Sequence, residues 1–583
     1  MVPKFKLPGS PPVPIVESVA TTTVTVGAPE SAETTTAEPP AVIALDVSDG
    51  DSGQTPDASA ALVAVPSEAV ATTASVVGEI SIPIVGKHHR VSLQRDCLDE
   101  FEDFAVDPKS EKSYVVLRSK GYPELLQIGS ALLDARIRSN ARALGQRLKK
   151  RDLEDANADL LGRASDNGLR IDLYPRVCPL PDRAGVEIDL CDGAGTTVVL
   201  APEGVQVLRG TSATLFRRSP SAMALPIPAD HGDTNLLRKF VNLVDGDLLL
   251  YQAWVAYTIT RPKVEASKYL VLVLKGGQGS GKSFACKVTQ QLIDPSSVGA
   301  QMLPSNPRDL ALMLQAKHLM VVDNMRDLTT EMSDTLCIAS TGGALATRKL
   351  YTDDEQKALH LHGAMILNGI HPFVGQSDFA DRCMVLELSP LAGTARRSEG
   401  QMLAEFAHDH PVILRGLYEL TAKTMAHLPN AEVVAPSRML DFCRWLGATE
   451  MARGLPVGTL QHRYADIIKD AQLESLLDNP LAAVILEFAE CMEVPEWAGT
   501  PTDFYDKLSL LADFASQKTR TWPTSAAVLS KRLYGLQAPL SAQGVFITLG
   551  RGKDRRIVVR NANPITGPKP GVDLTDSLEP IRN

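Results

Sequence analysis

The sequence contains few aromatic residues and no long apolar run. Aromatic residues make up 5% of the 583 residues, whereas apolar residues make up 44%, so the chain can still bury a sizeable core. No segment approaches the roughly 18–20 uninterrupted apolar residues that a membrane-spanning helix needs, and the first residues lack the apolar segment of a secretory signal. We therefore expect a protein that neither spans a membrane nor is secreted.

Cysteine is also scarce and dispersed. The eight cysteines lie far apart, with no CxxC pair and no Cys/His cluster. This spacing argues against a zinc ribbon and against a disulfide framework. It fits a reducing compartment, and the expected location is the cytoplasm.

An excess of positive charge, typical of nucleic-acid-binding proteins, is missing as well, because the formal net charge is −10. The imbalance is concentrated in residues 1–80, which hold 2 Lys and 10 Asp and Glu, whereas the rest of the chain carries 57 basic and 59 acidic groups. Residues 1–87 are rich in Ala, Thr, Val, Pro and Ser and can bury too little apolar surface to offset chain entropy. We predict a disordered acidic tail there, and the charge does not exclude DNA binding by the remainder.

Changes in hydrophobic periodicity divide the remainder into regions and predict a multidomain α/β protein. The expected regions are a helical region at 88–170, a small β-rich domain at 171–231, a helical collar at 232–266, a nucleotide-binding core at 267–392, a helical region at 393–497, a winged-helix domain at 498–562 and a flexible tail at 563–583.

The most informative stretch is GGQGSGKS, which lies between an apolar strand at 270–274 and an amphipathic helix. This is the GxxxxGKS phosphate-binding loop in its required context. Its glycines let backbone N–H groups approach phosphates, Lys282 can reach the β- and γ-phosphates, and Ser283 can ligate Mg²⁺. The predicted cofactors are ATP and Mg²⁺, contacted by Gly276, Gly277, Gln278, Gly279, Ser280, Gly281, Lys282, Ser283 and Phe284.

A second apolar strand, at 319–322, ends in Asp323 and Asn324. A carboxylate at the end of a core strand can hold Mg²⁺ or water beside the γ-phosphate. Many motor ATPases have a glutamate base at the next position, but an amide cannot accept a proton. Either Asp323 both holds the metal ion and accepts the proton of the attacking water, or Asp334 or Glu331 assists, or hydrolysis is slow.

Two further polar residues flank apolar strands. Asn368 ends the strand GAMILNGI, where it can hold the attacking water, although an asparagine before glycine is also typical of a turn. Arg382 precedes the next strand and can stabilise the transferred phosphoryl group in a neighbouring subunit. A salt bridge to Asp378 or Asp381 is the alternative.

Basic residues mark two expected DNA contacts. The segment between the second and third core strands is predicted to form a hairpin that carries Arg348 and Lys349. Near the C-terminus, two helices and a two-stranded hairpin with a basic turn follow the winged-helix pattern, with Thr524 or Ser525 able to cap the second helix. The cations expected to meet DNA there are Lys531, Arg532, Arg551, Lys553, Arg555 and Arg556.

The order of these motifs resembles superfamily 3 helicases, which are AAA+ motors of viruses, phages, plasmids and integrated elements. The resemblance is closest to phage and mobile-element primase-helicase-like replication proteins. It rests most on TGGALATRKLYTDDE and MILNGI, and it covers about 267–392 specifically. The roles that it implies are Walker A for Gly276–Ser283, Walker B for Asp323 and Asn324, sensor 1 for Asn368, a trans-acting arginine for Arg382, and a DNA-translocating hairpin for Arg348 and Lys349.

We therefore expect an ATP-dependent DNA motor, a replicative helicase-like ATPase of a phage, plasmid or integrated element. The expected partners are single-stranded or forked DNA, further copies of the chain in a hexameric ring, and other replication proteins. Two alternatives stay open, namely an origin-remodelling or loader ATPase without unwinding, and a slowly hydrolysing DNA-binding nucleotide switch.

Overall fold

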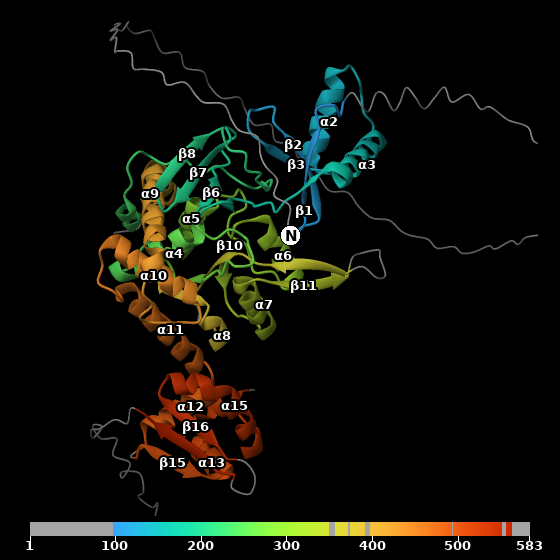
Figure 1. Ribbon diagram of the computed structural model, residues 1–583. Coiled ribbons are helices and arrows are strands. Elements are labelled where there is room, and N and C mark those ends of the chain that lie inside the picture. The colour runs from blue at the N-terminus through green and yellow to red at the C-terminus, as the bar shows by residue number, and fades with distance from the viewer. Residues whose placement is uncertain are drawn as a thin grey trace, which may run out of the picture. The chain divides into compact units, whose positions relative to one another are not determined.

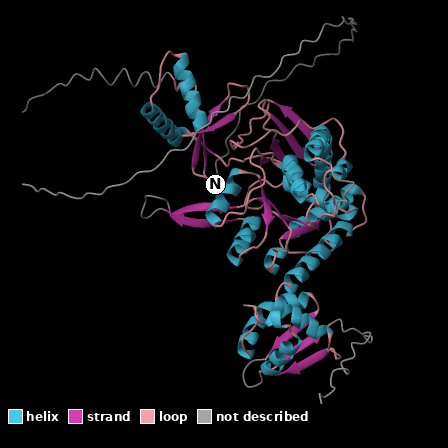
Figure 2. Ribbon diagram, turned by 180° about the vertical axis from the view of Figure 1, so that it is seen from behind, coloured by secondary structure: helices cyan, strands magenta, loops and turns pink. Residues whose placement is uncertain are grey.

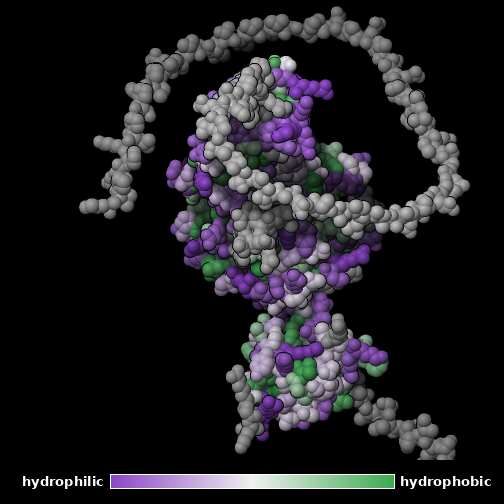
Figure 3. All heavy atoms as spheres, turned by 90° about the vertical axis from the view of Figure 1, so that its right-hand side faces the viewer, coloured by the Kyte–Doolittle hydropathy of each residue, from purple (hydrophilic) through white to green (hydrophobic). Residues whose placement is uncertain are grey.

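A computed structural model describes residues 97–348, 356–370, 374–390, 397–492, 494–519, 521–550 and 555–562. The predicted tails at 1–87 and 563–583 lie outside the described residues, as do Lys349, Arg551 and Lys553. Figure 1 shows the elements in chain order, and Figure 2 shows the same elements from behind. On the face drawn in Figure 3, hydrophilic side chains predominate among the described residues, and apolar ones form scattered areas.

The first region combines a small sheet with two helices. Its strands pair in the order β3-β2-β1-β4. The prediction of a helical region at 88–170 was therefore wrong for its first part, because Tyr114, Val115 and Val116 are β-branched or aromatic residues that pack well on a pleated surface. The elements are β1 (Asp103–Asp107), β2 (Lys112–Leu117), β3 (Glu124–Gln127), α2 (Ala131–Ala143), α3 (Lys150–Asn167) and β4 (Leu169–Arg170).

An antiparallel sheet follows within the region expected to be β-rich. Its four strands pair in sequence order, as a meander, and β7 is buried along its whole length. The strands are β5 (Val177–Pro179), β6 (Val186–Asp189), β7 (Thr196–Ala201) and β8 (Gly204–Arg209).

Two helical elements connect this sheet to the next one. The first is only a short 3-10 helix, η1 (Thr234–Lys239), whereas the second, α4 (Asp245–Ile259), is an α-helix buried on nearly every side. Helix α4 packs its aromatic side chains, Trp254 among them, into the largest core of the described chain. Its apolar run therefore reflects full burial rather than one buried face.

The central sheet is parallel, with the order β10-β13-β9-β14. Its two faces are covered differently, because Leu272 and Leu274 of β9 join a core with α4 and α5, whereas Val271 and Val273 join one with α6 and α7. Parallel strands bring their carboxyl ends to the same edge, where ligands of open α/β sheets usually bind. The elements are β9 (Val271–Lys275), α5 (Lys282–Ile293), α6 (Pro307–Ala316), β10 (Leu319–Met325), α7 (Thr330–Thr341), β13 (Ala364–Gly369), α8 (Ser377–Ala380) and β14 (Cys383–Glu387).

The hairpin predicted between the second and third core strands is confirmed. Strands β11 (Gly343–Arg348) and β12 (Gln356–Leu361) pair antiparallel, from Gly343 with Leu361 to Arg348 with Gln356. The pair projects away from the central sheet (Figure 1).

The remainder is helical and then mixed. Within the last part a strand that the sequence did not predict, β15, pairs with β17, so the expected two-stranded hairpin belongs to a three-stranded sheet of order β15-β17-β16. Ser525 caps α15 by accepting a hydrogen bond from the backbone N–H of Val528. The elements are α9 (Glu399–His427), η3 (Leu428–Asn430), α10 (Leu440–Arg453), α11 (Thr459–Leu477), α12 (Pro480–Glu490), β15 (Glu496–Gly499), α13 (Pro501–Leu511), α14 (Phe514–Gln517), α15 (Ala526–Ala542), β16 (Val545–Leu549) and β17 (Ile557–Asn561).

Candidate nucleotide site

A glycine-rich loop joins the end of β9 to the start of α5. Gly276, Gly279 and Gly281 have φ values of 147°, 79° and 88°, which L side chains rarely adopt. A Cβ on Gly276 would also lie 2.8 Å from both the carbonyl oxygen of Leu388 and the Oγ of Ser280. The sequence therefore needs glycine here for both backbone conformation and space.

Lys282 is the first residue of α5, and its side chain folds back over the loop. Its Nζ donates to the carbonyl oxygens of Gly276 and Gly277, at 2.7 and 2.9 Å. Burial lowers the pKa of Lys282, while the negative charge of Asp323 acts in the opposite direction. The ammonium thus lies in the loop, on acceptors that a phosphate could replace.

Ser283 and Asp323 meet at the carboxyl edge of the sheet. The Oγ of Ser283 lies 3.4 Å from Oδ1 of Asp323. A hydroxyl and a carboxylate are oxygen ligands of the kind that Mg²⁺ binds while it keeps several waters. Among the described residues, no group of three or more His, Cys, Asp or Glu is arranged to hold a metal ion.

Asn324 and Asn368 are joined by a hydrogen bond at the same edge. The backbone N–H of Asn324 donates to Oδ1 of Asn368 at 3.2 Å, and Nδ2 of Asn368 lies 3.1 Å from the Sγ of Cys286. The residue Asn324 has a φ of 60°, at an irregularity in the pairing of β10 with β13. Asn368 is 2% exposed, so its amide is held in one orientation between two strands and a helix.

Arg382 lies at the opposite edge, directly before the amino end of β14, where Cys383 pairs with Val271 at the start of β9. The guanidinium is buried, and its Nη1 contacts both the carbonyl oxygen and Oδ2 of Asp378, at 2.6 and 2.7 Å. Of the two interpretations made from the sequence, the structure contains the salt bridge to Asp378. The structure thus brings together Lys282, Ser283, Asp323, Asn324 and Asn368, but not Arg382.

A cavity of about 380 Å³ opens beside the loop, and sequence reasoning missed most of its walls. Gly279, Gly281 and Phe284 form the side nearest the phosphate loop. The side chain of Asn242 donates to the carbonyl oxygen of Ser389 at 2.6 Å, which ties the segment after η1 to the segment after β14. The remaining lining residues are Arg238, Lys239, Phe240, Asn242, Ser280, Leu388, Arg397, Glu399 and Met402.

The predicted DNA contacts are distributed over two separate surfaces. Arg348 is the last residue of β11, in the hairpin. Near the C-terminus, Lys531 is exposed on α15, whereas the guanidinium of Arg532 donates to the carbonyl oxygen of Thr521. Arg555 and Arg556 are exposed just before β17.

In the part of the chain that the structure describes, no helix has the length and apolar character needed to cross a membrane.

Two family models match consecutive parts of the chain. Residues 237–471 match the model of the actinomycete integrative conjugative element replication protein, and residues 481–570 match the model of the C-terminal domain of that family. These parts of the chain are therefore related to one replication-protein family of integrative conjugative elements. No curated protein matches the sequence.

Two solved structures are similar to the chain over most of its length. SCCmec type IV Cch, described as an active helicase, has a TM-score of 0.41 and 11% identity, over 79% of this chain and 92% of that chain. The C-terminal region of NrS-1 has a TM-score of 0.36 and 13% identity, over 80% of this chain and 98% of that chain. These low values leave the chemistry of the site to be judged from the residues of this chain.

Proposed function

We propose that this relative of the replication proteins of integrative conjugative elements is an ATP-dependent DNA motor. The observation that carries the proposal is the meeting of Lys282, Ser283, Asp323 and Asn368 at one edge of a parallel sheet, around a loop that only glycine can form. The proposal includes a nucleotide-binding core of the superfamily 3-like AAA+ type and a C-terminal winged helix.

ATP would bind with its phosphates in the loop and its base in the neighbouring cavity. The ammonium of Lys282 would exchange two carbonyl oxygens for phosphate oxygens, which carry full negative charge and accept stronger hydrogen bonds. Phe284 lines the cavity directly beyond the loop, and with Phe240 it supplies apolar surface for a base. Mg²⁺ would sit between the phosphates, Ser283 and Asp323 and would neutralise the charge that develops during phosphoryl transfer.

Hydrolysis needs a group that orients and deprotonates water. The buried amide of Asn368 can orient a water, and its own orientation is fixed by its two neighbours. Asn324 offers no carboxylate, so we assign the base to Asp323, which also serves the metal. Because Asp323 alone would both hold the metal ion and accept the proton, we expect slow hydrolysis until DNA or a neighbouring subunit improves the position of Asp323 relative to the water.

The motor would work as a ring, in which the hairpin grips DNA in the centre. Arg348 on β11 and Lys349 would contact the strand. Helix α7 connects the hairpin to β10, which carries Asp323, and residues 362–363 connect it to β13, which carries Asn368. Arg382 stands at the edge of the sheet away from its own loop. It can therefore serve only the ATP of a neighbouring subunit, after it releases Asp378.

Steady-state phosphate release by the full chain tests the proposal. We expect Mg²⁺-dependent release that single-stranded DNA stimulates, and we expect Lys282→Ala to abolish it. Lys150→Ala is the control, because Lys150 is an exposed lysine on α3 that does not line the nucleotide cavity. Equal turnover of wild type and Lys282→Ala would show that the loop is not the site.

The absence of a carboxylate at Asn324 favours a second candidate, a DNA-binding nucleotide switch that holds ATP without turning it over. Binding of ATP at Lys282 with no phosphate release under any DNA condition would support the switch over the motor. An origin-remodelling or loader ATPase would release phosphate but would not separate strands.

A further inference from the structure

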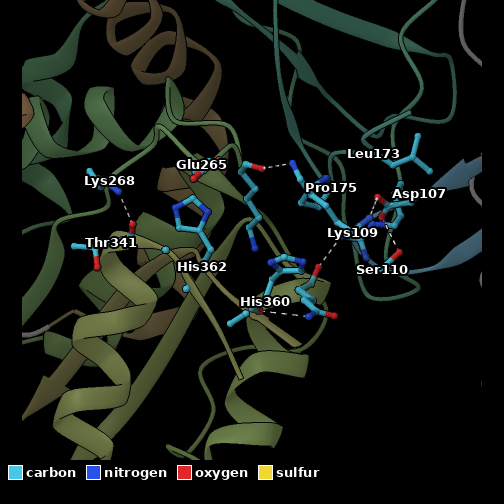
Figure 4. A pocket seen from close by; sticks show the side chains of 16 residues that line it. Asp107, Lys109, Ser110, Leu173, Pro175, Glu265, Lys268, Thr341, His360 and His362 are labelled. Carbon is cyan, nitrogen blue, oxygen red and sulfur yellow. Dashed lines mark hydrogen bonds between the residues drawn. The ribbon is translucent and has the colours of Figure 1, made fainter. Parts of the chain in front are cut away.

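A second cavity, of about 530 Å³, lies at the base of the hairpin and away from the glycine-rich loop. Figure 4 shows that its walls come from separate parts of the chain: Lys109 and Ser110 follow β1, Lys268 precedes β9, and His360 and His362 belong to the hairpin side. Pockets of roughly 300–1,000 Å³ commonly hold small-molecule ligands. The cavity is thus large enough for a nucleotide.

Cations outnumber carboxylates in the lining. The cations are Lys109, Arg217, Lys263 and Lys268, and the carboxylates are Asp107 and Glu265.

The acceptors of these cations are mostly neutral. Lys268 donates to the carbonyl oxygen of Thr341 at 2.6 Å, and Lys263 donates to the carbonyl oxygens of Leu314 and Lys317. Neutral carbonyl groups do not cancel the positive charge of an ammonium, so the charge of Lys268, and that of Lys263 in its protonated form, persists in the cavity.

Three other charged groups also matter. Arg217 donates through Nη2 to the carbonyl oxygen of Gln315, and its Nε has no acceptor among the described residues. Lys109 does pair with a carboxylate, Asp172, at 2.6 Å. The carboxylate of Asp107 accepts hydrogen bonds from the Oγ of Ser110 at 2.6 Å and from the backbone N–H of Lys109.

Burial is the main cause of lowered pKa values in two lining groups, and nearby cations act in the same direction. The pKa of Lys263 is lowered to about 7, first by burial and then by the charge of Arg217, while the charge of Asp294 acts in the opposite direction. Burial also lowers the pKa of His362 to about 4, with the charges of Lys263, Lys268 and Lys109 acting in the same direction. An anion in the cavity would stabilise the protonated forms of Lys263 and His362 and would raise the pKa of both groups.

We propose that this cavity is a phosphate-binding site that takes one nucleotide unit, separate from the ATP site. The phosphate would lie against Arg217, Lys263 and Lys268, where charge-assisted hydrogen bonds replace contacts to neutral carbonyls.

The position of the site at the base of the hairpin links its occupation to the hairpin. Gly342, Gly343 and Ala344 form part of the wall, and the ring of His362 lies 3.4 Å from the place where a Cβ on Gly342 would be. His362 also contacts the carbonyl oxygen of Ser267 at 2.8 Å, next to Lys268. A bound phosphate would hold both ends of the hairpin against the segment that leads into β9.

The phosphate could come from a free nucleotide or from the backbone of a DNA strand, and two probes separate these sources. The first is thymidine 5′-monophosphate, followed by calorimetry, and the second is a ten-residue oligothymidylate, followed by fluorescence anisotropy. Both are measured on the full chain with saturating Mg·ADP, which keeps the glycine-rich loop occupied.

Three variants are compared with wild type. Lys268→Gln removes a cation from the wall, and His360→Glu places a negative charge on an exposed residue at the rim, where folding is not at risk. Lys150→Gln is the control, because it removes an exposed lysine on α3 that does not line the cavity. Thermal melting and ADP affinity check that each variant is folded.

We expect Lys268→Gln and His360→Glu each to weaken binding of one probe by about ten-fold or more, while Lys150→Gln has no effect. Loss of monophosphate binding identifies a free nucleotide as the source. Weakened oligothymidylate binding, with no binding of the monophosphate to wild type, identifies a DNA strand. The proposal is overturned if neither probe binds, or if both folded cavity variants bind like the control.

Discussion

Asn324 gives the sharpest test of the proposed hydrolysis chemistry, because its backbone limits which substitutions are informative. Its φ of 60° lies in the left-handed region, which Asn, Asp and Gly tolerate and most other residues do not. Its backbone N–H donates to Oδ1 of Asn368, so a new side chain at this position leaves that hydrogen bond intact. Asn324→Asp therefore adds a carboxylate at nearly unchanged shape, whereas Asn324→Glu adds a carboxylate and backbone strain.

The two effects have separate magnitudes. Glu in the left-handed region should cost about 1–2 kcal/mol of unfolding free energy, whereas Asp and the control Asn324→Gly should cost little. A positioned general base typically contributes 10²–10⁴-fold in rate, but the neighbouring charge of Asp323 reduces the gain. We therefore expect Asn324→Asp to raise kcat by about ten-fold, and Asn324→Gly to leave it unchanged or lower.

Phosphate release at saturating Mg·ATP gives kcat, and chemical unfolding of the same preparations gives stability. An Asn324→Asp variant with unchanged or lower kcat would refute the view that a missing base limits turnover. An Asn324→Glu variant as stable as wild type would refute the argument from the backbone.

Three further outcomes are expected. Mixing Arg382→Ala with Lys282→Ala protein should restore part of the ATPase activity, because an interface between the two variants can pair the intact loop of one subunit with the intact Arg382 of the other. No recovery in mixtures whose assembly is confirmed would show that Arg382 only forms its salt bridge. Replacing the exposed Arg555 and Arg556 by Ala should reduce the slope of log K for DNA binding against log salt concentration by up to about 0.7–0.9 per lost phosphate contact, while basal ATPase activity stays unchanged. An unaltered slope in binding titrations would contradict the proposed contact. Burial lowers the pKa of His410 to about 4, so the folded chain does not bind a proton that the unfolded chain binds near pH 6.5. The free energy of unfolding should therefore fall between about pH 6.5 and 4, by up to about 1.4 kcal/mol per pH unit. This pH dependence, measured by chemical unfolding, should be less steep in His410→Gln, and an identical slope would contradict the assignment.

The parts of the site that were predictable are those that local sequence encodes. The spacing of Gly276, Gly281 and Lys282 specifies a loop between a strand and a helix, and an apolar run followed by Asp323 or Asn368 marks a strand end at the same edge. These signals are local because backbone conformation and strand burial depend on neighbouring residues.

The parts that were missed depend on contacts between distant segments. Phe240 and Leu388 line one cavity although they are far apart in the chain, and nothing in the short segment around Phe240 distinguishes a cavity wall from ordinary packing. The neighbouring sequence does not predict the left-handed backbone of Asn324; it shows only that asparagine is a residue type that tolerates this conformation. The strands at 103–127 are short and mixed in composition, so pairing between strands, rather than periodicity, determines them.

Strand separation on a forked DNA tests the central claim most directly. The full chain is incubated with Mg·ATP and a fork whose displaced strand carries a fluorophore, and Lys282→Ala and a non-hydrolysable ATP analogue serve as controls. The account predicts release of the labelled strand with ATP and wild-type protein, and no release with either control. Phosphate release without strand separation, or strand separation that persists in Lys282→Ala, would contradict an ATP-driven motor powered from this loop.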